Sequence, residues 1–407
     1  MTNKSSNRYK WLIIGLLTAA TFSTLGITSI WGPIMPSFID NLNITRTQGG
    51  LILTGFSLAG MITIMLWGAF IDKIGVSKLY GYTAILLGII VFSIGLANDY
   101  VLIFAVMFCA GLISPSQNIF RQKATMDWFS KSERATANGI AITCLGLAPF
   151  IFTPLATYLV DTSGYHWSIM LYIAGAIVIL VGIALIFLYR DPKSVQKRSK
   201  PSGSMLKRLS GFGTLLRNRN AMLAYIGFSA SGGTMQMATA WGITYLRTEL
   251  GLEPMVAAAI MMTWSIAGMF RPLGGIINDR IFKGKRKLSC VPSALFEGLI
   301  CLMLVILPRN SSIYVVGLIF FFLSFSRAMW GASGSIWGAE LVPLELVGSS
   351  VAMQGLISGV VRSAFPFLIG WIVDLTDSFT YGWLSVALIE LLVTVPAWAM
   401  VKEDDSK

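Results

Sequence analysis

Five basic residues interrupt long apolar segments of this chain: Arg121, Lys123, Arg271, Arg327 and Arg362. An ionised side chain at the centre of a membrane-spanning helix costs about 2.5–3.5 kcal/mol on insertion scales, so each one needs a partner or a polar cavity. A guanidinium group suits a carboxylate or a phosphate, because its planar fork donates to two oxygens at once. These residues therefore predict a binding site for a small anion.

Uncharged polar residues in the same kind of segment can complete such a site. Gln236 and Gln354 are the strongest of these candidates, because a buried amide needs hydrogen-bond partners. Asn118 and Trp31 are further candidates for contact with a ligand. A single aromatic residue is more often packed or placed at the membrane interface than used for binding.

The composition identifies the elements that must carry these residues. The chain has 407 residues, of which 55% are hydrophobic and only 12% are charged. Soluble proteins of this size have about a quarter of their residues charged. The apolar runs are too long for barrel strands, so the expected fold is an all-α membrane protein.

We expect twelve transmembrane helices, arranged as two six-helix bundles around a central cavity. The expected spans are 11–39, 47–70, 79–98, 101–126, 136–160, 167–189, 221–246, 255–277, 288–307, 312–338, 347–373 and 381–401. Residues 1–190 form the first bundle and residues 221–407 the second. Residues 191–220 are basic and contain proline, glycine and serine, which is typical of a cytoplasmic linker.

The charges of the loops predict the orientation. Of the 26 Lys and Arg residues in loops and tails, 23 fall on one side if the N-terminus is cytoplasmic. Positive loops face the cytoplasm, so both termini are expected there, in a multi-pass protein of the cell membrane. The net charge of +12 therefore reflects membrane topology, and no nucleic-acid partner is expected.

A charged turn occurs once in each half. Gly68, Asp72, Lys73, Gly75 and Lys78 lie between the second and third spans, and Gly275, Asp279 and Arg280 lie between the eighth and ninth. The two aspartates are offset by 207 residues, which indicates a duplication. Parallel six-helix repeats build transporters whose substrate site lies near the membrane midplane.

These turns resemble the loop signature of the major facilitator superfamily. The segment from Trp128 to Gly139, with Glu133, Arg134 and Ala135, is similar to a turn common in its anion:cation symporter branch. The resemblance implies alternating access, with charged groups at the inner face that pair in one conformation and separate in the other. Asp72, Lys73, Lys78, Arg134, Asp279 and Arg280 are the expected gating residues, and a pair between Asp72 and Arg134 is one such contact. The alternative is that these charges only fix the topology.

The resemblance also assigns roles to the intramembrane charges. Arg271 and Pro272 resemble a stretch in the eighth span of oxalate/formate and monocarboxylate carriers, and Lys123 stands where the symporter branch has a basic residue lining the pathway. Glu297 and Glu390 lie in spans that are peripheral in the superfamily. We therefore expect Arg271, Arg327 and Arg362 to bind substrate. The alternative is that each of them pairs with a buried carboxylate or with a helix C-terminus. Lys123 has the alternative of extending to the cytoplasmic interface.

The predicted function is a secondary active transporter that imports a small organic anion: a monocarboxylate, a dicarboxylate or a sugar acid. Proton coupling is favoured, with Asp40 or Glu297 as candidate proton carriers, while anion exchange and uniport stay open. A drug or metabolite efflux carrier is the main alternative, and a transporter-like sensor is another. No nucleotide-binding loop, catalytic triad or metal cluster is readable, so we expect no enzyme activity, no cofactor and no metal. A monomer suffices for this function.

Overall fold

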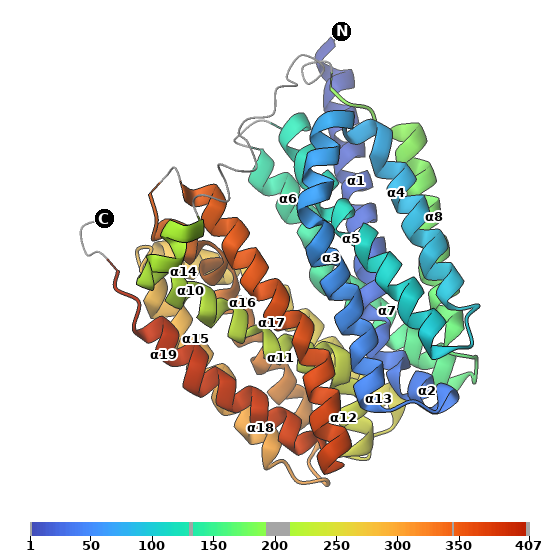
Figure 1. The fold of residues 1–407 in the computed structure, drawn as a ribbon, viewed down its shortest axis with the longest axis vertical. Coiled ribbons are helices and arrows are strands. Elements are labelled where there is room, and N and C mark those ends of the chain that lie inside the picture. Colours follow the sequence, from blue (N-terminus) through green and yellow to red (C-terminus); the bar gives the residue numbers. More distant parts are fainter. Residues whose placement is uncertain (1, 130–132, 193–211, 344–345, 404–407) are drawn as a thin grey trace. The chain divides into compact units, whose positions relative to one another are not determined.

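The computed structural model describes residues 2–129, 133–192, 212–343 and 346–403. These residues form helices joined by short turns (Figure 1). They include ten helices that are long and apolar enough to cross a membrane, and a shorter apolar one, Leu79–Ile94. A broken helical run over residues 219–248 adds a further segment. The prediction of an all-α membrane fold is confirmed, with about ten to twelve apolar helices.

The chain divides into two compact units. Met1–Ile44 and Gly55–Pro201 form the first unit, and Thr45–Thr54 and Ser202–Lys407 form the second. Residues 193–211 lie outside the described residues, and so does most of the predicted linker; residues 212–217 are helical.

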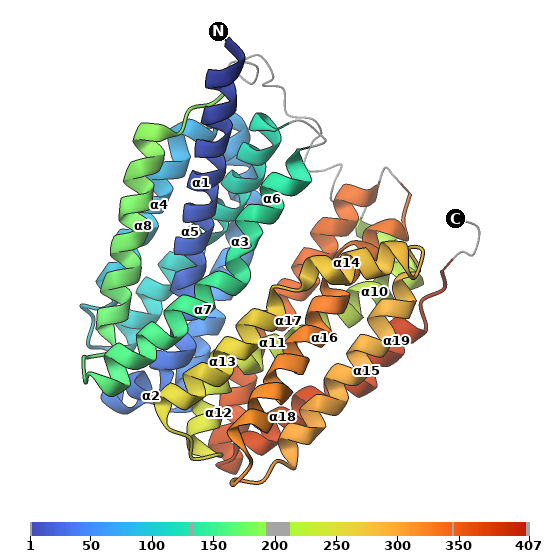
Figure 2. The ribbon, with the colours of Figure 1, turned by 180° about the vertical axis from the view of Figure 1, so that it is seen from behind.

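The first unit holds eight α-helices and one π-helical turn. They are α1 (Thr2–Ser29), α2 (Trp31–Leu42), α3 (Arg46–Ile74, whose first turns group with the second unit), α4 (Val76–Ile94), α5 (Tyr100–Trp128), α6 (Arg134–Ile142), α7 (Cys144–Thr157), η1 (Tyr158–Thr162) and α8 (Ser168–Leu188). Within it, α4 lies along α8, and α1 packs against α5, α6, α7 and α8 (Figures 1 and 2).

The second unit is built from shorter pieces. They are α10 (Arg219–Ala230), α11 (Gly232–Gln236), η3 (Met237–Trp241), α12 (Gly242–Thr248), α13 (Pro254–Gly268), α14 (Arg271–Arg280), α15 (Arg286–Val305), α16 (Ile313–Glu340), α17 (Val347–Thr376), α18 (Phe379–Ile389), η5 (Glu390–Thr394) and α19 (Val395–Ala399). Figure 2 shows α15 beside α16, and α13 followed by α14.

Two of the predicted spans are interrupted. The span predicted as 255–277 breaks at Met269 and Phe270, and α14 then begins at Arg271. Pro272 explains the break, because proline has no backbone N–H to donate to the preceding turn. The span predicted as 221–246 breaks at Ser231 and contains the π-helical turn η3. Both interruptions fall next to the arginines of the second unit.

Candidate functional site

The break at Ser231 positions two arginines. Arg327 of α16 donates a hydrogen bond to the backbone carbonyl of Ser231. Arg362 of α17 lies over Gly232, where an added Cβ would be 2.6 Å from the Arg362 Cγ and 3.0 Å from its Nε. Only glycine leaves room for the Arg362 side chain in this position. The guanidinium carbon of Arg362 is 5.0 Å from the centre of the Phe228 ring, which adds a cation–π contact.

Arg271 reaches the same region from α14. Gly274 allows α14 to approach α16 closely, because a Cβ there would lie 2.5 Å from the carbonyl oxygen of Met329. Arg271 lies one turn before Gly274, and its Nε is 3.9 Å from the position of a Cβ at Gly331. The charges of Arg271, Arg327 and Arg362 are close enough to repel one another.

Arg327 has an acidic partner in Glu297. Its Nη1 is 2.8 Å from the Oε1 of Glu297, and the indole N–H of Trp330 donates to Oε2 at 2.9 Å. Glu297 is completely buried and Arg327 is 5% exposed. The alternative of a buried carboxylate partner therefore holds for Arg327. Superfamily position placed Glu297 at the periphery, but its side chain turns inward from α15 towards α16.

Of Arg271, Arg327 and Arg362, the first and the last have no carboxylate contact among the described residues. The Nε of Arg362 is buried and has no hydrogen-bond partner there. A buried donor without a partner costs roughly 1–3 kcal/mol, and more when it is charged. A ligand that carries one or two carboxylates can accept from this Nε and neutralise the charges of both guanidinium groups.

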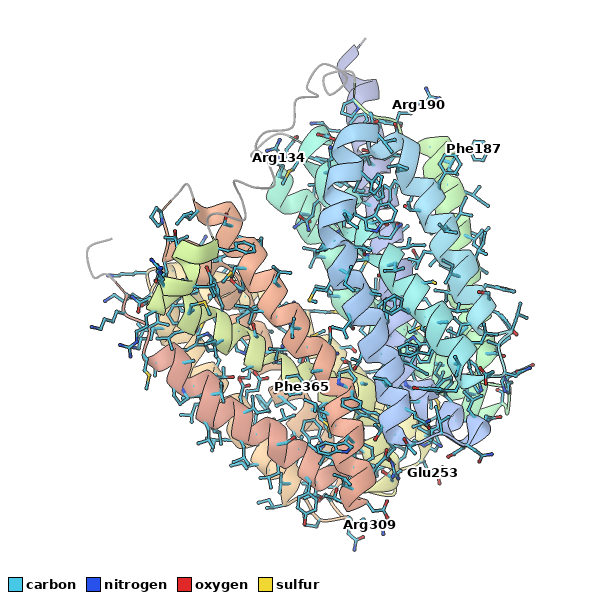
Figure 3. All side chains as sticks on the ribbon, viewed as in Figure 1. Arg134, Phe187, Arg190, Glu253, Arg309 and Phe365 are labelled. Atoms are coloured by element: carbon cyan, nitrogen blue, oxygen red, sulfur yellow. The ribbon has the colours of Figure 1, made fainter. Side chains whose placement is uncertain are left out.

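The two predicted amides lie on the helices around Arg362. Gln236 donates to the carbonyl of Arg362 at 3.4 Å. Gln354 donates to the carbonyl of Gly334 at 3.2 Å, and its side-chain oxygen is buried without a partner. Phe365, on the same helix as Arg362, packs over Gly233 (Figure 3). The side-chain oxygen of Gln354 therefore lacks a hydrogen-bond donor among the described residues.

The first unit has a buried cation, Arg121, which was one of the five intramembrane basic residues but was not assigned to substrate binding. Arg121 is 8% exposed, and its terminal nitrogens donate to the side-chain oxygens of Asn118 and Asn138. Lys123, which was preferred, donates to the backbone carbonyl of Ile71 on α3. Arg121 and Lys123 lie on different faces of α5. Asn118 lies one turn before Arg121 on the same face, and this spacing is the sequence signal that could have favoured Arg121.

Trp31 and Asp40 occupy less informative positions. Trp31 is 3% exposed, and its ring packs edge-to-face against Phe38 with centroids 5.5 Å apart. Packing within the first unit accounts for this side chain. Asp40 is exposed near the end of α2.

The predicted gating residues are described only in part. The side chains of Asp72, Lys73 and Lys78 lie outside the described residues. Arg134 donates to the backbone carbonyls of Phe129 and Met126, at the end of α5 (Figure 3). Its predicted pairing with Asp72 stays a prediction.

The second copy of the turn is better described. Asp279 accepts from Arg286 at 2.9 Å, and Arg286 also binds both carboxylate oxygens of Glu340 at 2.9 and 3.0 Å. Arg280 is exposed. This cluster joins the ends of α14, α15 and α16.

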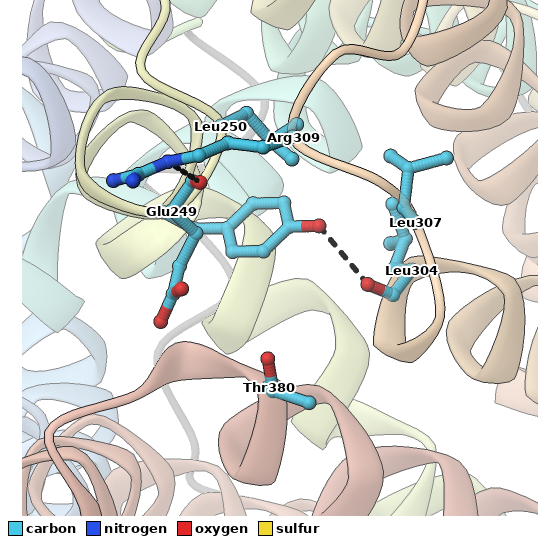
Figure 4. A pocket seen from close by; sticks show the side chains of 7 residues that line it. Glu249, Leu250, Leu304, Leu307, Arg309 and Thr380 are labelled. Atoms are coloured by element: carbon cyan, nitrogen blue, oxygen red, sulfur yellow. Dashed lines mark hydrogen bonds between the residues drawn. The ribbon is translucent and has the colours of Figure 1, made fainter.

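A pocket of about 340 Å³ lies at the opposite end of the second unit (Figure 4). The polar groups that line this pocket form hydrogen bonds within the protein. Arg309 donates to the carbonyls of Glu249 and Thr248, the Tyr245 hydroxyl donates to the carbonyl of Leu304, and Glu249 accepts from the backbone of Phe379. Figure 3 places Arg309 and Glu253 at this end. The two charged residues that line the pocket, Arg309 and Glu249, are thus both bonded to backbone groups of the loops.

The helices and the buried charges define a multi-pass membrane transporter. The model of the Major Facilitator Superfamily matches residues 16–366 of the chain. The chain belongs to this superfamily, whose members are transporters and not enzymes.

Curated relatives and a solved structure agree with this assignment. The chain is 25% identical to the "Probable L-galactonate transporter" of Escherichia coli K12, over 84% of this chain and 78% of that protein. It is 24% identical to the "Probable galactarate/D-glucarate transporter GudP" of Bacillus subtilis 168, over 91% and 87%. The crystal structure of the nucleoside transporter NupG has a TM-score of 0.76 at 16% identity, covering 96% of this chain and 100% of that one. This last similarity shows the fold alone.

Proposed function

We propose that the protein is a secondary active transporter that imports a sugar acid across the cell membrane by alternating access, coupled to protons. Both termini face the cytoplasm in this proposal. The observation that carries it is the pair Arg271 and Arg362, two cations with no carboxylate contact among the described residues. The names of the relatives, which specify galactonate, galactarate and glucarate, narrow the anion to a hydroxylated carboxylate.

The chemistry of the site fits such a substrate. A carboxylate accepts two parallel hydrogen bonds from one guanidinium group, and each charge-assisted bond contributes about 1.5–3 kcal/mol. The hydroxyl groups of a sugar acid need acceptors as well as donors. The unpartnered side-chain oxygen of Gln354 supplies an acceptor.

The efflux alternative requires a different charge pattern. A carrier of cationic drugs would use a free buried carboxylate, whereas both oxygens of Glu297 are engaged by Arg327 and Trp330. Arg271 and Arg362, by contrast, are cations without a carboxylate contact among the described residues.

Transport into proteoliposomes tests the proposal. Galactarate, D-glucarate, L-galactonate and lactate would be compared with neutral galactose, with and without an inward proton gradient. We expect gradient-dependent uptake of the sugar acids and none of galactose. Arg271→Gln should raise the apparent KM on the order of ten- to a hundred-fold, because one charge-assisted carboxylate contact is lost. Arg219→Gln makes the same change at an exposed position and is the control. Normal transport by Arg271→Gln would contradict the proposed site.

A further inference from the structure

The second unit contains another buried acid, Glu390, which the anion site does not use. Glu390 is 0% exposed and begins the π-helical turn η5 in the last segment of the unit. Single π-helical turns inside α-helices occur frequently at functional sites. One carboxyl oxygen accepts from the Thr394 hydroxyl at 3.3 Å, and the other is buried with no partner among the described residues.

The charged groups that interact with Glu390 are one acid and one cation. Glu390 interacts electrostatically with Glu297 and Arg327, and the Cys301 thiol lies within the field of both acids. The Nη1 of Arg327 is engaged by Glu297 and by the carbonyl of Ser231. The Arg327 guanidinium group therefore pairs with Glu297, and no cation among the described residues contacts Glu390.

The other elements that pack against η5 bring no further charge to this cluster. On α10, Tyr225 is bonded to Ser350 and Arg219 is exposed at the helix start. On α18, Tyr381 is exposed, and α19 carries no ionisable side chain. Ionising both buried carboxyls would leave an uncompensated negative charge, which is so costly that such a group binds a proton instead.

We propose that Glu390, next to Glu297, is the site that binds the transported proton. This inference rests on the proposed function and names the coupling site. The Glu390 carboxylate takes one proton from water and becomes a neutral carboxylic acid, and it returns that proton to water when a conformational change hydrates the cluster. No other bond forms or breaks.

The arginines link this proton to the anion. Arg327 interacts electrostatically with Glu390 and also with Arg271 and Arg362. A bound anion removes positive charge from this region, which favours the protonated form of Glu390. Because linkage between two binding sites is reciprocal, a bound proton must raise the affinity for the anion by the same factor. Proton and anion are then carried together.

Glu390→Gln tests the coupling, since glutamine imitates the protonated acid and cannot release a proton. The variant should still exchange internal for external labelled galactarate, but it should lose accumulation driven by an inward proton gradient. Its apparent affinity for galactarate should no longer depend on pH. Glu253→Gln changes an exposed acid and should behave as the unmodified protein. Gradient-driven accumulation by Glu390→Gln equal to that of the unmodified protein would overturn the proposal.

Infrared spectroscopy of the purified protein gives a measurement that needs no substrate. The unmodified protein and Glu253→Gln should show, at neutral pH, the carbonyl stretching band of a protonated carboxylic acid, and Glu390→Gln should lack it. Absence of the band from the unmodified protein overturns the proposal even if the variant fails to fold, and so does a band that survives in a folded Glu390→Gln. If the band behaves as expected but no sugar acid is transported, the proposed function fails and the proton site stands.

Discussion

The carboxylate of Glu297 and the guanidinium group of Arg327 form a buried ion pair, with Oε1 and Nη1 2.8 Å apart. Trp330 donates to the other carboxylate oxygen, so both oxygens of Glu297 are satisfied. Such pairs gain little net stability over apolar packing, but losing one partner leaves a buried charge alone. Among Arg271, Arg327 and Arg362, the pair thus neutralises Arg327 and leaves the other two without a carboxylate contact among the described residues.

Glu297→Gln should destabilise the protein by about 3–5 kcal/mol, the usual cost of breaking a buried ion pair. The reason is that Arg327 would keep its charge at a position that is 5% exposed. Thermal unfolding in detergent measures the effect, with Glu253→Gln as the control for an exposed glutamate. The double variant Glu297→Gln and Arg327→Gln should recover part of the loss. A single variant as stable as the unmodified protein would show that the pair is not fully desolvated.

Arg362→Lys should weaken binding of a sugar acid although it keeps the positive charge. Lysine has no planar fork, so it cannot present two parallel donors to one carboxylate. We expect the dissociation constant to rise about ten-fold, equal to about 1.4 kcal/mol, as measured by thermal shift or calorimetry with galactarate. Arg219→Lys is the control. Unchanged affinity in Arg362→Lys would mean that Arg362 acts only through its charge.

Gly232→Ala should disturb the anion site although no ionisable residue is replaced. The added methyl group would lie 2.6 Å from the Arg362 Cγ, so the arginine must move away from the break at Ser231. The affinity for galactarate should fall, while the thermal stability changes by no more than about 1–3 kcal/mol. Gly348→Ala is the matched control, because a Cβ at Gly348 meets nothing within 4 Å. If Gly232→Ala binds galactarate normally, Arg362 does not need its observed position.

Much of the fold was predictable, because the length of each apolar segment and the charge of each loop can be read directly from consecutive residues. The apolar segments and the charged turns at Asp72 and Asp279 predicted the class of fold. Arg271 and Arg362 could also be selected, since an arginine inside an apolar segment is costly wherever it lies.

The partners of these buried charges could not be predicted from the sequence, because they depend on how each helix is rotated. Whether Arg327 meets Glu297 depends on the rotation of α15 against α16, which sequence spacing does not specify. The same holds for Arg121 and Lys123, which are two residues apart on α5 and therefore point in different directions. The breaks at Ser231 and Phe270 change those rotations again.

Arg121→Gln should impair transport more than Lys123→Gln does, which reverses the order expected from the superfamily pattern. Arg121 is held by the neutral side chains of Asn118 and Asn138, so its charge is oriented by amides but not cancelled by them. A buried cation in that condition can be compensated by an anionic ligand, whereas Lys123 is directed towards the carbonyl of Ile71 on α3. Initial rates of galactarate uptake measure the difference. Size-exclusion chromatography of both purified variants shows whether each is produced as folded protein. Asn138→Leu should mimic part of the Arg121→Gln defect, because it removes one of the two groups that orient the guanidinium. A larger defect in Lys123→Gln would indicate that Lys123 contacts the substrate and that Arg121 has only a structural function in the first unit.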